Sequence, residues 1–442
     1  MLRREPVTER LILFEDERVA AFEPVALTRS VASLRSGALT ARERAASRFP
    51  GLETGLLCRG ALAATESASG VWGCVNGNGA GAAFFLSAAG ALSPDLASLP
   101  TPAPGEALLA DGRFIAARAD ADAAARIVSR IREILGDGLS PDPVGPDWGR
   151  ILEECGLSVS DFPLSIPSHA ADLMANAPRM LAEEFAAPEK SAPPVDPVDF
   201  PGVSFVRPER VRLAEGVTLA PGVVVDATDG PVSLGPGTRV GANAVLTGPV
   251  GIGAGSVVNP AARLLHGVAT GPACKLGGEV EQSVLLGYSN KQHDGFLGHS
   301  YLGCWVNLGA ATDTSDLKND YGAVKITLCG SRVDTGSRHV GSIIGDHSKT
   351  GIHTMLNTGT VLGVSANVFG AGYPPTEIPS FVWGGPGDWA DYRVDKALQV
   401  AAVVTARRGI SFGKPDEELL RRVRDETATP RKAWLEGRAR EE

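Results

Sequence analysis

A period of six residues organises the apolar positions in the second half of the chain. Aliphatic side chains, with threonine at two places, recur at this interval over 213–225, 234–276 and 344–368. Neither an α-helix, with 3.6 residues per turn, nor an alternating strand has this period. Hexapeptide repeats of a parallel β-helix do have it, because each repeat forms one short strand and one corner. The pattern therefore predicts a β-helix and leaves a glycine- and valine-rich β-sandwich as the alternative.

The first half of the chain has a different pattern. Three short apolar runs, LILF at 11–14, GLLC at 55–58 and AAFFL at 82–86, are typical of buried strands. Residues 121–135 have the spacing of an amphipathic helix. Strands mixed with helices in this way predict a layered α/β domain.

The remaining segments suggest the domain boundaries. Residues 169–187 have a helical pattern, and the proline-rich residues 187–202 are typical of a stiff linker. Near the C-terminus, residues 391–409 and 415–426 predict two further helices. We therefore expect an α/β domain over 1–190, a β-helix over 200–385 and a helical extension over 386–442.

Composition and charge narrow the classes of partner. The formal net charge of −9 argues against nonspecific binding to nucleic acid or to anionic membranes. The six cysteines are scattered without a CxxC pair, which is typical of reduced thiols in a cytosol. No signal peptide is evident, and no apolar run is long enough to span a bilayer. We therefore expect a cytoplasmic protein with neither a nucleic-acid nor a membrane partner.

Candidate chemistry lies in SNKQHDGFLGHSYLGCWVNLGAAT, residues 289–312. Phe296, Leu302 and Leu308 are the expected inward residues of this stretch, yet lysine, histidine and aspartate occupy 291–294. Charged groups are costly inside a packed coil, so we expect them to project from a corner. They are either solvated corner residues or parts of a site.

This stretch resembles the acetyltransferase half of the bifunctional enzyme that acetylates glucosamine-1-phosphate and then uridylylates it. In that family a catalytic histidine precedes a V-N-I-G-A-G-T run by a fixed interval. Here VNLGAAT at 306–312 follows His293 at the same interval. The resemblance implies that His293 is the general base and that Asn307 lines the sugar site. Phe296 stands where the family has a tyrosine, so one hydroxyl is missing.

Downstream, LKNDYGAVK at 317–325 resembles that family's Asn-Tyr-Asp-Gly…Lys segment. Two basic residues that hold the substrate phosphate in the family align here with Leu265 and Ser283, so other cations must replace them. Arg263 is one candidate. The resemblance implies substrate binding by Lys291, Phe296, Asn307, Lys318, Asn319, Tyr321 and Lys325.

The whole chain is similar to a bacterial variant family of sugar nucleotidyltransferases, in which a β-helix follows the transferase domain. Ordinary sugar nucleotidyltransferases carry a Gly-rich loop with G-T-R after the first strand, but PVALTRSVASLRSGALTARER at 24–44 stands there in this chain. It resembles the variant family's P-L-T-L-T-R-P-V-x-E-L-R-x-G-I-L-T-x-R-E segment. An amphipathic helix with solvated arginines is the alternative. The resemblance implies nucleotide binding by Thr28, Arg29, Arg35, Gly37, Arg42 and Asn76.

The resemblance also implies a fold and a reaction. The fold is an α/β nucleotidyltransferase-like domain, then a left-handed parallel β-helix of hexapeptide repeats, then a short helical tail. The β-helix would transfer acetyl from acetyl-CoA to glucosamine-1-phosphate. The first domain would join UTP and N-acetylglucosamine-1-phosphate, releasing pyrophosphate, with Mg²⁺. The metal ligands stay unassigned, with Asp111 as a candidate, and the expected assembly is a homotrimer.

Two other classes of protein stay open. A zinc hydro-lyase built on a β-helix would need three histidines that converge between subunits. A regulatory or scaffold protein with a degenerate first domain would need no chemistry at all. The histidines that could serve the zinc enzyme are His293, His299, His339, His347 and His353.

Overall fold

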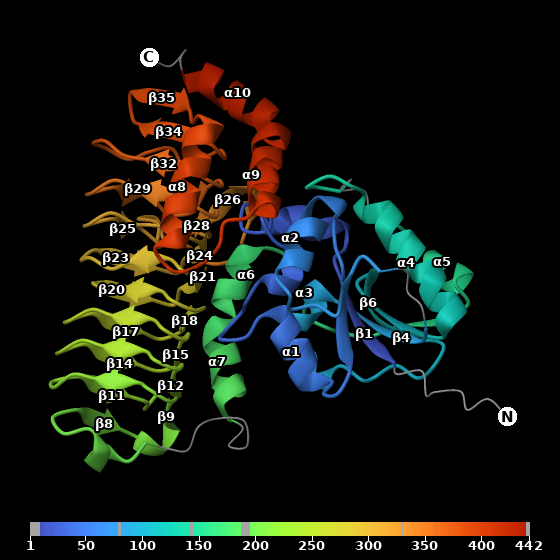
Figure 1. Cartoon of the computed structure of the whole chain (residues 1–442), viewed down its shortest axis with the longest axis horizontal. Helices are drawn as coiled ribbons and strands as arrows, with labels where there is room; N and C mark the ends of the chain where they lie inside the picture. The colour runs from blue at the N-terminus through green and yellow to red at the C-terminus, as the bar shows by residue number, and fades with distance from the viewer. Residues whose placement is uncertain (1–8, 78–80, 142–144, 187–194, 329, 439–442) are drawn as a thin grey trace. The chain divides into compact units, whose positions relative to one another are not determined.

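The computed structural model describes residues 9–77, 81–141, 145–186, 195–328 and 330–438. Contacts divide the chain into two compact units (Figure 1). The first contains Met1–Phe22, Ala26–Leu34 and Leu39–His169, and the second contains Glu23–Val25, Arg35–Ala38 and Ala170–Glu442.

A seven-stranded sheet forms the centre of the first unit, in the order β3-β2-β1-β4-β6-β5-β7. β1 pairs in parallel with β2 and β4, whereas β6 is antiparallel to β4 and β5. The three apolar runs predicted as strands lie within β1, β2 and β4, except for Cys58 at the end of the second run and Ala82 at the start of the third. The strands are β1 (Arg10–Phe14), β2 (Glu53–Leu57), β3 (Cys74–Val75), β4 (Ala83–Ser87), β5 (Glu106–Ala110), β6 (Arg113–Ala119) and β7 (Ser158–Asp161).

Helices cover both faces of this sheet. α4 (Ala121–Leu135) has the bounds that the sequence predicts, and it lies with α5 (Trp148–Glu154) on one face (Figure 1). On that face the ring of Phe114 stacks on Phe14 at 4.4 Å and meets Trp148 at 5.2 Å. The opposite face carries α1 (Ala41–Arg48), α2 (Ala63–Ala68) and α3 (Ala88–Ala91). The predicted layered α/β domain is confirmed.

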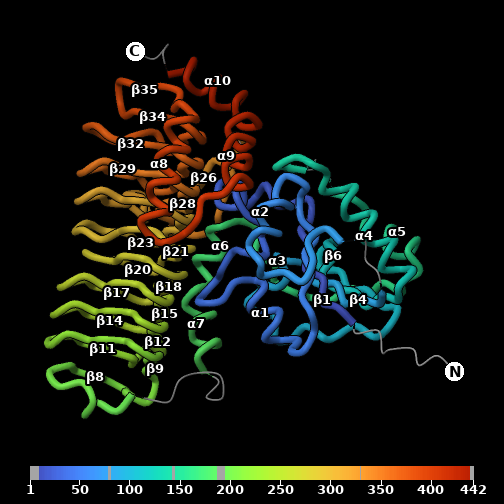
Figure 2. Tube along the Cα trace, in the orientation of Figure 1, coloured from blue at the N-terminus to red at the C-terminus, as the bar shows by residue number. Residues whose placement is uncertain are grey.

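The second unit is the predicted left-handed β-helix, whose coils stack as a ladder of short parallel strands (Figure 2). Each coil passes through three faces, which we number in chain order. Inward residues of successive coils stack in register, as Val225 does on Leu246 and Leu246 on Leu264. Face 1 contains β8 (Ser204–Val206), β11 (Val224–Asp226), β14 (Val245–Thr247), β17 (Arg263–Leu265), β20 (Glu279–Glu281) and β23 (Phe296–Gly298), and continues with β25 (Asp313–Thr314) and β30 (Met355–Leu356).

The other two faces complete the prism. Face 2 contains β9 (Val211–Leu213), β12 (Val232–Leu234), β15 (Val250–Ile252), β18 (Val268–Thr270), β21 (Val284–Gly287), β24 (Tyr301–Cys304), β28 (Ser342–Ile344), β31 (Thr360–Leu362) and β33 (Glu377–Ile378). Face 3 contains β10 (Thr218–Leu219), β13 (Arg239–Val240), β16 (Val257–Val258), β19 (Lys275–Leu276), β22 (Asn290–Lys291), β29 (Lys349–Thr350) and β32 (Asn367–Val368).

The six-residue spacing of inward residues fails in the coil that carries the candidate chemistry. Leu297, not Phe296, pairs with Val280 and is fully buried, so the prediction that Phe296 points inward was wrong. The next inward residue, Leu302, follows after five residues rather than six. Phe296 therefore stands on the opposite side of β23, because successive side chains of a strand alternate.

Two helices pack on face 2 within the second unit. The single helix predicted over 169–187 is divided into α6 (Ala170–Ala175) and α7 (Ala177–Ala186), because Pro178 has no N–H to continue a helix. A Cβ atom on Gly251 of β15 would lie 2.6 Å from Leu181 Cδ2, so α7 approaches the strand closely. Both helices belong with the β-helix rather than with the predicted first domain. Residues 187–194 of the predicted linker lie outside the described residues.

The C-terminal part closes the last coils. β34 (Val382–Gly385) and β35 (Asp388–Asp391) form an antiparallel pair, followed by α8 (Val394–Ala406), α9 (Lys414–Glu426) and α10 (Ala428–Arg438). Arg431 of α10 is buried and pairs with Asp391 at 2.9 Å. The predicted helical tail is confirmed. Among the described residues, no helix has the length and apolar character that crossing a membrane requires.

Candidate functional site

Lys291 occupies an inward position of the β-helix. It pairs with Leu276 of the coil before and is only 1% exposed. Its Nζ donates hydrogen bonds to the carbonyl oxygens of Gly277 at 3.4 Å, His293 at 2.7 Å and Gly295 at 3.0 Å. An ammonium has three hydrogens, and three carbonyls accept from it here. Lys291 thus holds together the turn 292–295, which we call the His293 corner.

Burial has a measurable effect on this ammonium. Loss of hydration lowers the pKa of Lys291 to about 8, and the nearby carboxylates of Asp313 and Asp294 oppose that shift. To contact a substrate directly, Lys291 would have to break its hydrogen bond to at least one of the three carbonyl oxygens. The position of Lys291 therefore suits the support of the His293 corner better than the binding of a phosphate.

The His293 side chain is exposed at the edge between faces 3 and 1. Its Nε2 lies 3.1 Å from Nε2 of Gln292. Because an amide nitrogen can only donate, Nε2 of His293 accepts this bond and the neutral ring carries its proton on Nδ1. The carbonyl of Gln292 in turn accepts a 2.6 Å bond from Asn259. The corner thus exposes an imidazole whose single lone pair, on Nε2, accepts a hydrogen bond from Gln292.

Asn307 lies on face 3 in the following coil, which is the face that leads to the His293 corner. It bridges Asn290 on one side and Lys349 on the other, and its Oδ1 accepts from Asn290 Nδ2 at 3.1 Å. Arg408, which follows α8, donates to Asn290 Oδ1 at 2.7 Å. Sequence reasoning could not find Arg408, since only the fold brings the C-terminal segment to this face.

The predicted substrate residues after Asn307 lie in an insertion, residues 315–341, between β25 and β28. It contains the hairpin of β26 (Lys325–Leu328) and β27 (Ser331–Asp334). Lys318 pairs with Asp320 at 3.2 Å, Lys325 lies 3.8 Å from Asp334, and Tyr321 is 66% exposed. Asn319 is exposed as well. Phe296 is outside the insertion, and its backbone N–H donates to Asp313 at 2.7 Å.

The two ends of the insertion meet at His299 rather than at His293. Nδ1 of His299 lies 2.6 Å from Oδ2 of Asp316, and the rings of His299 and His339 are 4.9 Å apart. His299 stands at the edge between faces 1 and 2, so β23 separates it from the His293 corner. The predicted catalytic base and the predicted residues of the insertion therefore lie at different edges of one chain.

The other histidines of the zinc alternative are dispersed. His347 stacks on Trp305 at 6.2 Å at the edge between faces 2 and 3. His353 is exposed at the edge that also carries the His293 corner, where its N–H donates to Ala310. Among the described residues of one chain, His299 and His339 are the histidines of this set whose rings lie close together.

In the first unit, a buried ion pair anchors the predicted nucleotide segment. Glu15, directly after β1, pairs at 2.9 Å with Arg59, two residues after the end of β2, and neither is exposed. Arg59 also donates to the carbonyls of Ala26 and Arg29. The Thr28 hydroxyl beside them is buried and has no hydrogen-bond partner among the described residues. A charged residue immediately after an apolar run was the sequence signal for Glu15 and Arg59, and sequence reasoning missed it.

Two further predicted residues adjoin the same ends of the strands. Asn76 follows β3, and its Oδ1 accepts from the N–H of Cys58 at 2.9 Å. Arg42 lies over the ring of Trp72 at 5.8 Å. Glu66 accepts from Trp72 Nε1 at 2.9 Å and from Ser30 N–H at 2.8 Å. Arg29 is therefore linked to Arg59, Asn76 to Cys58, and Arg42 to Trp72. Thr28 joins them only as the chain neighbour of Arg29. Ligands often bind at the carboxyl ends of parallel strands.

Arg35 and Gly37 belong to the second unit instead. Tyr301 of β24 exchanges two hydrogen bonds with the backbone of Arg35, of 3.2 and 2.8 Å. Gly37 has φ +89°, and a Cβ there would lie 2.8 Å from Met180 of α7. These two residues thus have packing roles within the β-helix unit, and the predicted nucleotide set is divided between the units.

Three described acids near the carboxyl ends of β1 and β2, Glu15, Asp16 and Glu66, have partners other than a Mg²⁺ ion. Glu15 is held by Arg59, Asp16 is paired with Arg113 at 3.2 Å, and Glu66 accepts from amide and indole donors. Asp111 is exposed in the two-residue turn between β5 and β6, where φ is +49°. Asp-Gly is favoured at such turns, so this aspartate has a conformational explanation.

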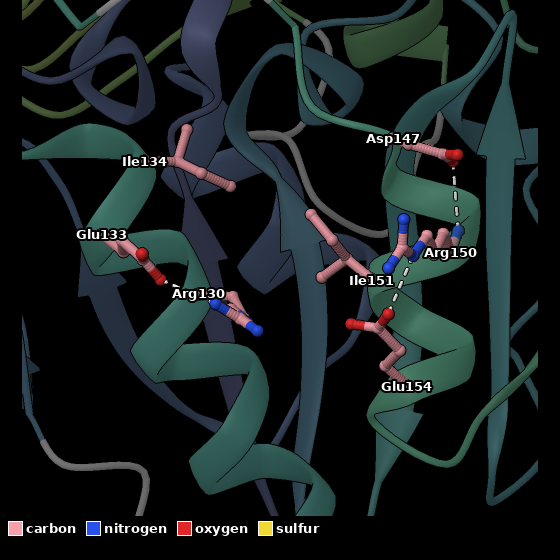
Figure 3. Close-up of a pocket in the computed structure, with 7 residues that line it drawn as sticks. All are labelled: Arg130, Glu133, Ile134, Asp147, Arg150, Ile151 and Glu154. Atoms are coloured by element: carbon pink, nitrogen blue, oxygen red, sulfur yellow. Dashed lines mark hydrogen bonds and ion pairs between the residues drawn. The ribbon is translucent and has the colours of Figure 1, made fainter.

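A cavity of about 360 Å³ lies between α4 and α5 (Figure 3). Its charged side chains pair within their own helices, Arg130 with Glu133 and Arg150 with Glu154. None of the predicted site residues lines it. The cavity therefore belongs to the helical surface of the first unit and not to the candidate site.

Comparisons with known proteins find similarity to sugar nucleotidyltransferases and to bifunctional enzymes. Residues 11–190 match the model of a family described as sugar nucleotidyl transferase. A bifunctional sugar-1-phosphate nucleotidylyltransferase/acetyltransferase of Sulfurisphaera tokodaii is 34% identical over 91 residues, which are 21% of this chain and 23% of that protein. The bifunctional protein GlmU of Synechococcus elongatus is 27% identical over 198 residues, 40% of each chain. That of Paraburkholderia phytofirmans is 37% identical over 115 residues, 25% of this chain and 24% of that protein.

The similarity is partial. The chain spans less than half the length of the curated relatives that it matches. Among solved structures, a Bacillus cereus protein titled as a candidate acetyltransferase covers 50% of this chain and 96% of its own, at 15% identity and a TM-score of 0.16. Because the TM-score is so low, nothing about this chain is inferred from that structure. The family match and the relatives' names support enzyme activity for this chain.

Proposed function

We propose that the chain is a bifunctional enzyme of UDP-N-acetylglucosamine synthesis in the cytoplasm. Its β-helix would acetylate glucosamine-1-phosphate with acetyl-CoA. Its first unit would then join the product to UTP and release pyrophosphate. The observation that carries this proposal is the exposed imidazole of His293 on a corner that buried Lys291 supports. The names of the curated relatives supply the type of substrate.

The acetyl transfer needs a base because an ammonium has no lone pair with which to attack a thioester. His293 is suited to that task near neutral pH, and its Nε2 already accepts a hydrogen bond from Gln292. The substrate amine would replace that amide and give its proton to Nε2. The amine nitrogen then bonds to the thioester carbonyl carbon and the carbon–sulfur bond breaks. The nitrogen loses its second proton as the amide forms, the leaving thiolate takes up one proton, and coenzyme A departs as the thiol. Asn307 would orient the sugar.

A homotrimer would complete the acetyl-transfer site. His293 and the insertion lie at different edges of one prism, so one chain does not assemble all the predicted residues around His293. Packing β-helices side by side would set the insertion of one chain against the His293 corner of the next. Lys318 and Lys325, with Asn319 and Tyr321, would then reach the sugar phosphate, and Phe296 would contact the sugar from its own chain. This arrangement leaves Lys291 as a supporting residue.

The uridylyl transfer would take place in the first unit. Thr28, Arg29, Arg42 and Asn76 adjoin the carboxyl ends of β1 to β3, where amide and cationic donors could hold a triphosphate. Arg35 and Gly37 would act indirectly, by fixing the segment that follows. Mg²⁺ stays part of the proposal as the ion that accompanies UTP, and no residue is assigned to it.

Product analysis by mass spectrometry tests both halves. The full chain is supplied with glucosamine-1-phosphate, acetyl-CoA, UTP and Mg²⁺, and then with each omitted in turn. We expect N-acetylglucosamine-1-phosphate without UTP and UDP-N-acetylglucosamine with all four. Acetylation without any nucleotide sugar would indicate a degenerate first unit. No product from any mixture, with no binding of acetyl-CoA or UTP, would favour the scaffold alternative and overturn the proposal.

A further inference from the structure

We propose that His299, Asp316 and His339 bind a divalent transition-metal ion, for which zinc fits the donors best. One ligand atom from each residue lies within 4.8 Å of the other two. Two imidazole nitrogens and one carboxylate oxygen are a donor set that zinc accepts, with a fourth position for water. The site is a property of one chain and does not depend on the proposed acetyl or uridylyl transfer.

The geometry needs only small movements to hold the ion. Nδ1 of His299 and Oδ2 of Asp316 are 2.6 Å apart and now share a proton. Ligands at zinc bond lengths in a tetrahedron lie about 3.3 Å apart, so these two atoms must separate by about 0.7 Å. The ion would replace the shared proton. His339 is exposed and its ring is tilted by 33° to that of His299, so it can turn toward the ion.

The backbone beneath these side chains is fixed by hydrogen bonds. The N–H of Val340 donates to the carbonyl of Asp316 at 2.9 Å, and that of Gly341 donates to the carbonyl of His299 at 2.8 Å. The side chains of His299 and Asp316 are only 13% and 15% exposed. Two of the three ligands are therefore held in place before an ion arrives, and the exposed third ligand leaves a path for entry.

Binding would clamp the insertion. Asp316 and His339 lie near its two ends, and His299 is a corner of the preceding coil, so one ion would join three segments. The insertion 315–341 should then resist local opening more strongly when the metal is bound, because a ligand that binds the closed state stabilises it. Without metal, a single hydrogen bond joins His299 to Asp316 and orients the His299 ring, but it does not tie His339 to them.

The test uses the full chain after chelator treatment. Zinc is titrated against a chromophoric chelator, and cobalt(II) is added separately to record ligand-field absorption. We expect one ion per chain, with an intense visible spectrum for cobalt that indicates low coordination number. Asp316→Asn and His339→Ala should each weaken zinc binding at least as much as loss of an outer-shell partner does, about 10–100-fold. Both side chains reach the surface, so these variants should fold.

His353→Ala is the matched control, because it removes another exposed corner histidine from the same β-helix. Its zinc affinity should equal that of the unaltered chain. A second readout is tryptic cleavage within the insertion, which carries Lys318, Lys325, Arg332 and Arg338. Zinc should slow it in the unaltered chain and not in Asp316→Asn. Zinc binding that survives both ligand substitutions, or less than one ion per chain at excess zinc, would overturn the proposal.

Discussion

The ammonium of Lys291 lies 2.7 Å from the carbonyl oxygen of His293 and is buried beneath the corner that exposes the imidazole. A lysine inside a hexapeptide coil replaces one aliphatic side chain of the stack. Its cost is the lost hydration of a charge, and three carbonyl acceptors offset part of that cost. The three hydrogen bonds of Lys291 make the His293 corner rigid, and a general base needs such rigidity to meet its substrate in one geometry.

Replacing His293 by alanine should lower kcat for acetyl transfer by about 10²–10⁴-fold, because the reaction loses its general base. Uridylyl transfer should stay near the level of the unaltered chain. Steady-state kinetics of both reactions, with His353→Ala as the control for removing an exposed corner imidazole, would check this. An unchanged kcat for His293→Ala would make His293 an ordinary solvated residue.

The stability of the protein should depend on pH through Lys291. Its pKa in the folded chain is about 8, below the usual 10.5, so between these values the unfolded chain binds more protons. The free energy of unfolding should therefore rise with pH over this range, by up to about 3 kcal/mol relative to Lys291→Met. Below pH 8 the lysine is charged in both states and the cost of burying it is present in full.

Thermal unfolding of the unaltered chain and of Lys291→Met across this pH range would measure the effect. Lys325→Met removes a lysine that is exposed, so its curve should run parallel to that of the unaltered chain. If the stability of Lys291→Met changes with pH in the same way as that of the unaltered chain, the ammonium of Lys291 is not desolvated in solution.

Arg59→Met should destabilise the first unit by about 3–5 kcal/mol, because it leaves the buried Glu15 carboxylate without its partner. The double variant Glu15→Met with Arg59→Met should recover much of that loss, since no charge stays buried. Uridylyl transfer should fall in both, because the carbonyls of Ala26 and Arg29 lose their donor. Acetyl transfer serves as the internal control. Urea denaturation of the full chain gives the stability, and a double variant less stable than Arg59→Met would contradict the argument.

The assembly prediction is checked by light scattering coupled to gel filtration. A homotrimer should have about three times the chain mass of 45.8 kDa, or a multiple of that value. A monomer at micromolar concentration would contradict both the trimer and the acetyl-transfer site proposed between chains.

The periodic parts of the fold were predictable from the sequence, and the departures from periodicity were not. Seven consecutive intervals of six residues, from Leu234 to Leu276, predicted the β-helix because the stacking of coils repeats the same local environment. The shift from Phe296 to Leu297 was missed, since both residues are apolar and only the pairing with Val280 decides which points inward. Local apolar character cannot distinguish two neighbours in one strand.

Contacts between distant segments account for the rest. The helical pattern and proline-rich stretch near residue 190 suggested a boundary there, but α6, α7 and residues 35–38 pack with the β-helix. A cut at that stretch would remove the partner of Gly251, which is small because Leu181 lies against it. Likewise His299 looked like an ordinary corner residue, because Asp316 and His339 reach it only after the insertion has closed.

The insertion leaves the β-helix and returns to it at nearly the same place, so the stacking of coils on face 2 does not pass through it. The chain leaves after β25 and returns beside its point of departure, where Val340 bonds to Asp316 and β28 pairs directly with β24. Coils above and below keep their register whatever lies between. The entropic cost of closing a flexible loop grows slowly with its length, by about 0.6 kcal/mol for each doubling. The exposed turns between residues 317 and 338 could therefore change in length at little cost, whereas the buried side chains of Val324, Ile326 and Leu328 must stay apolar.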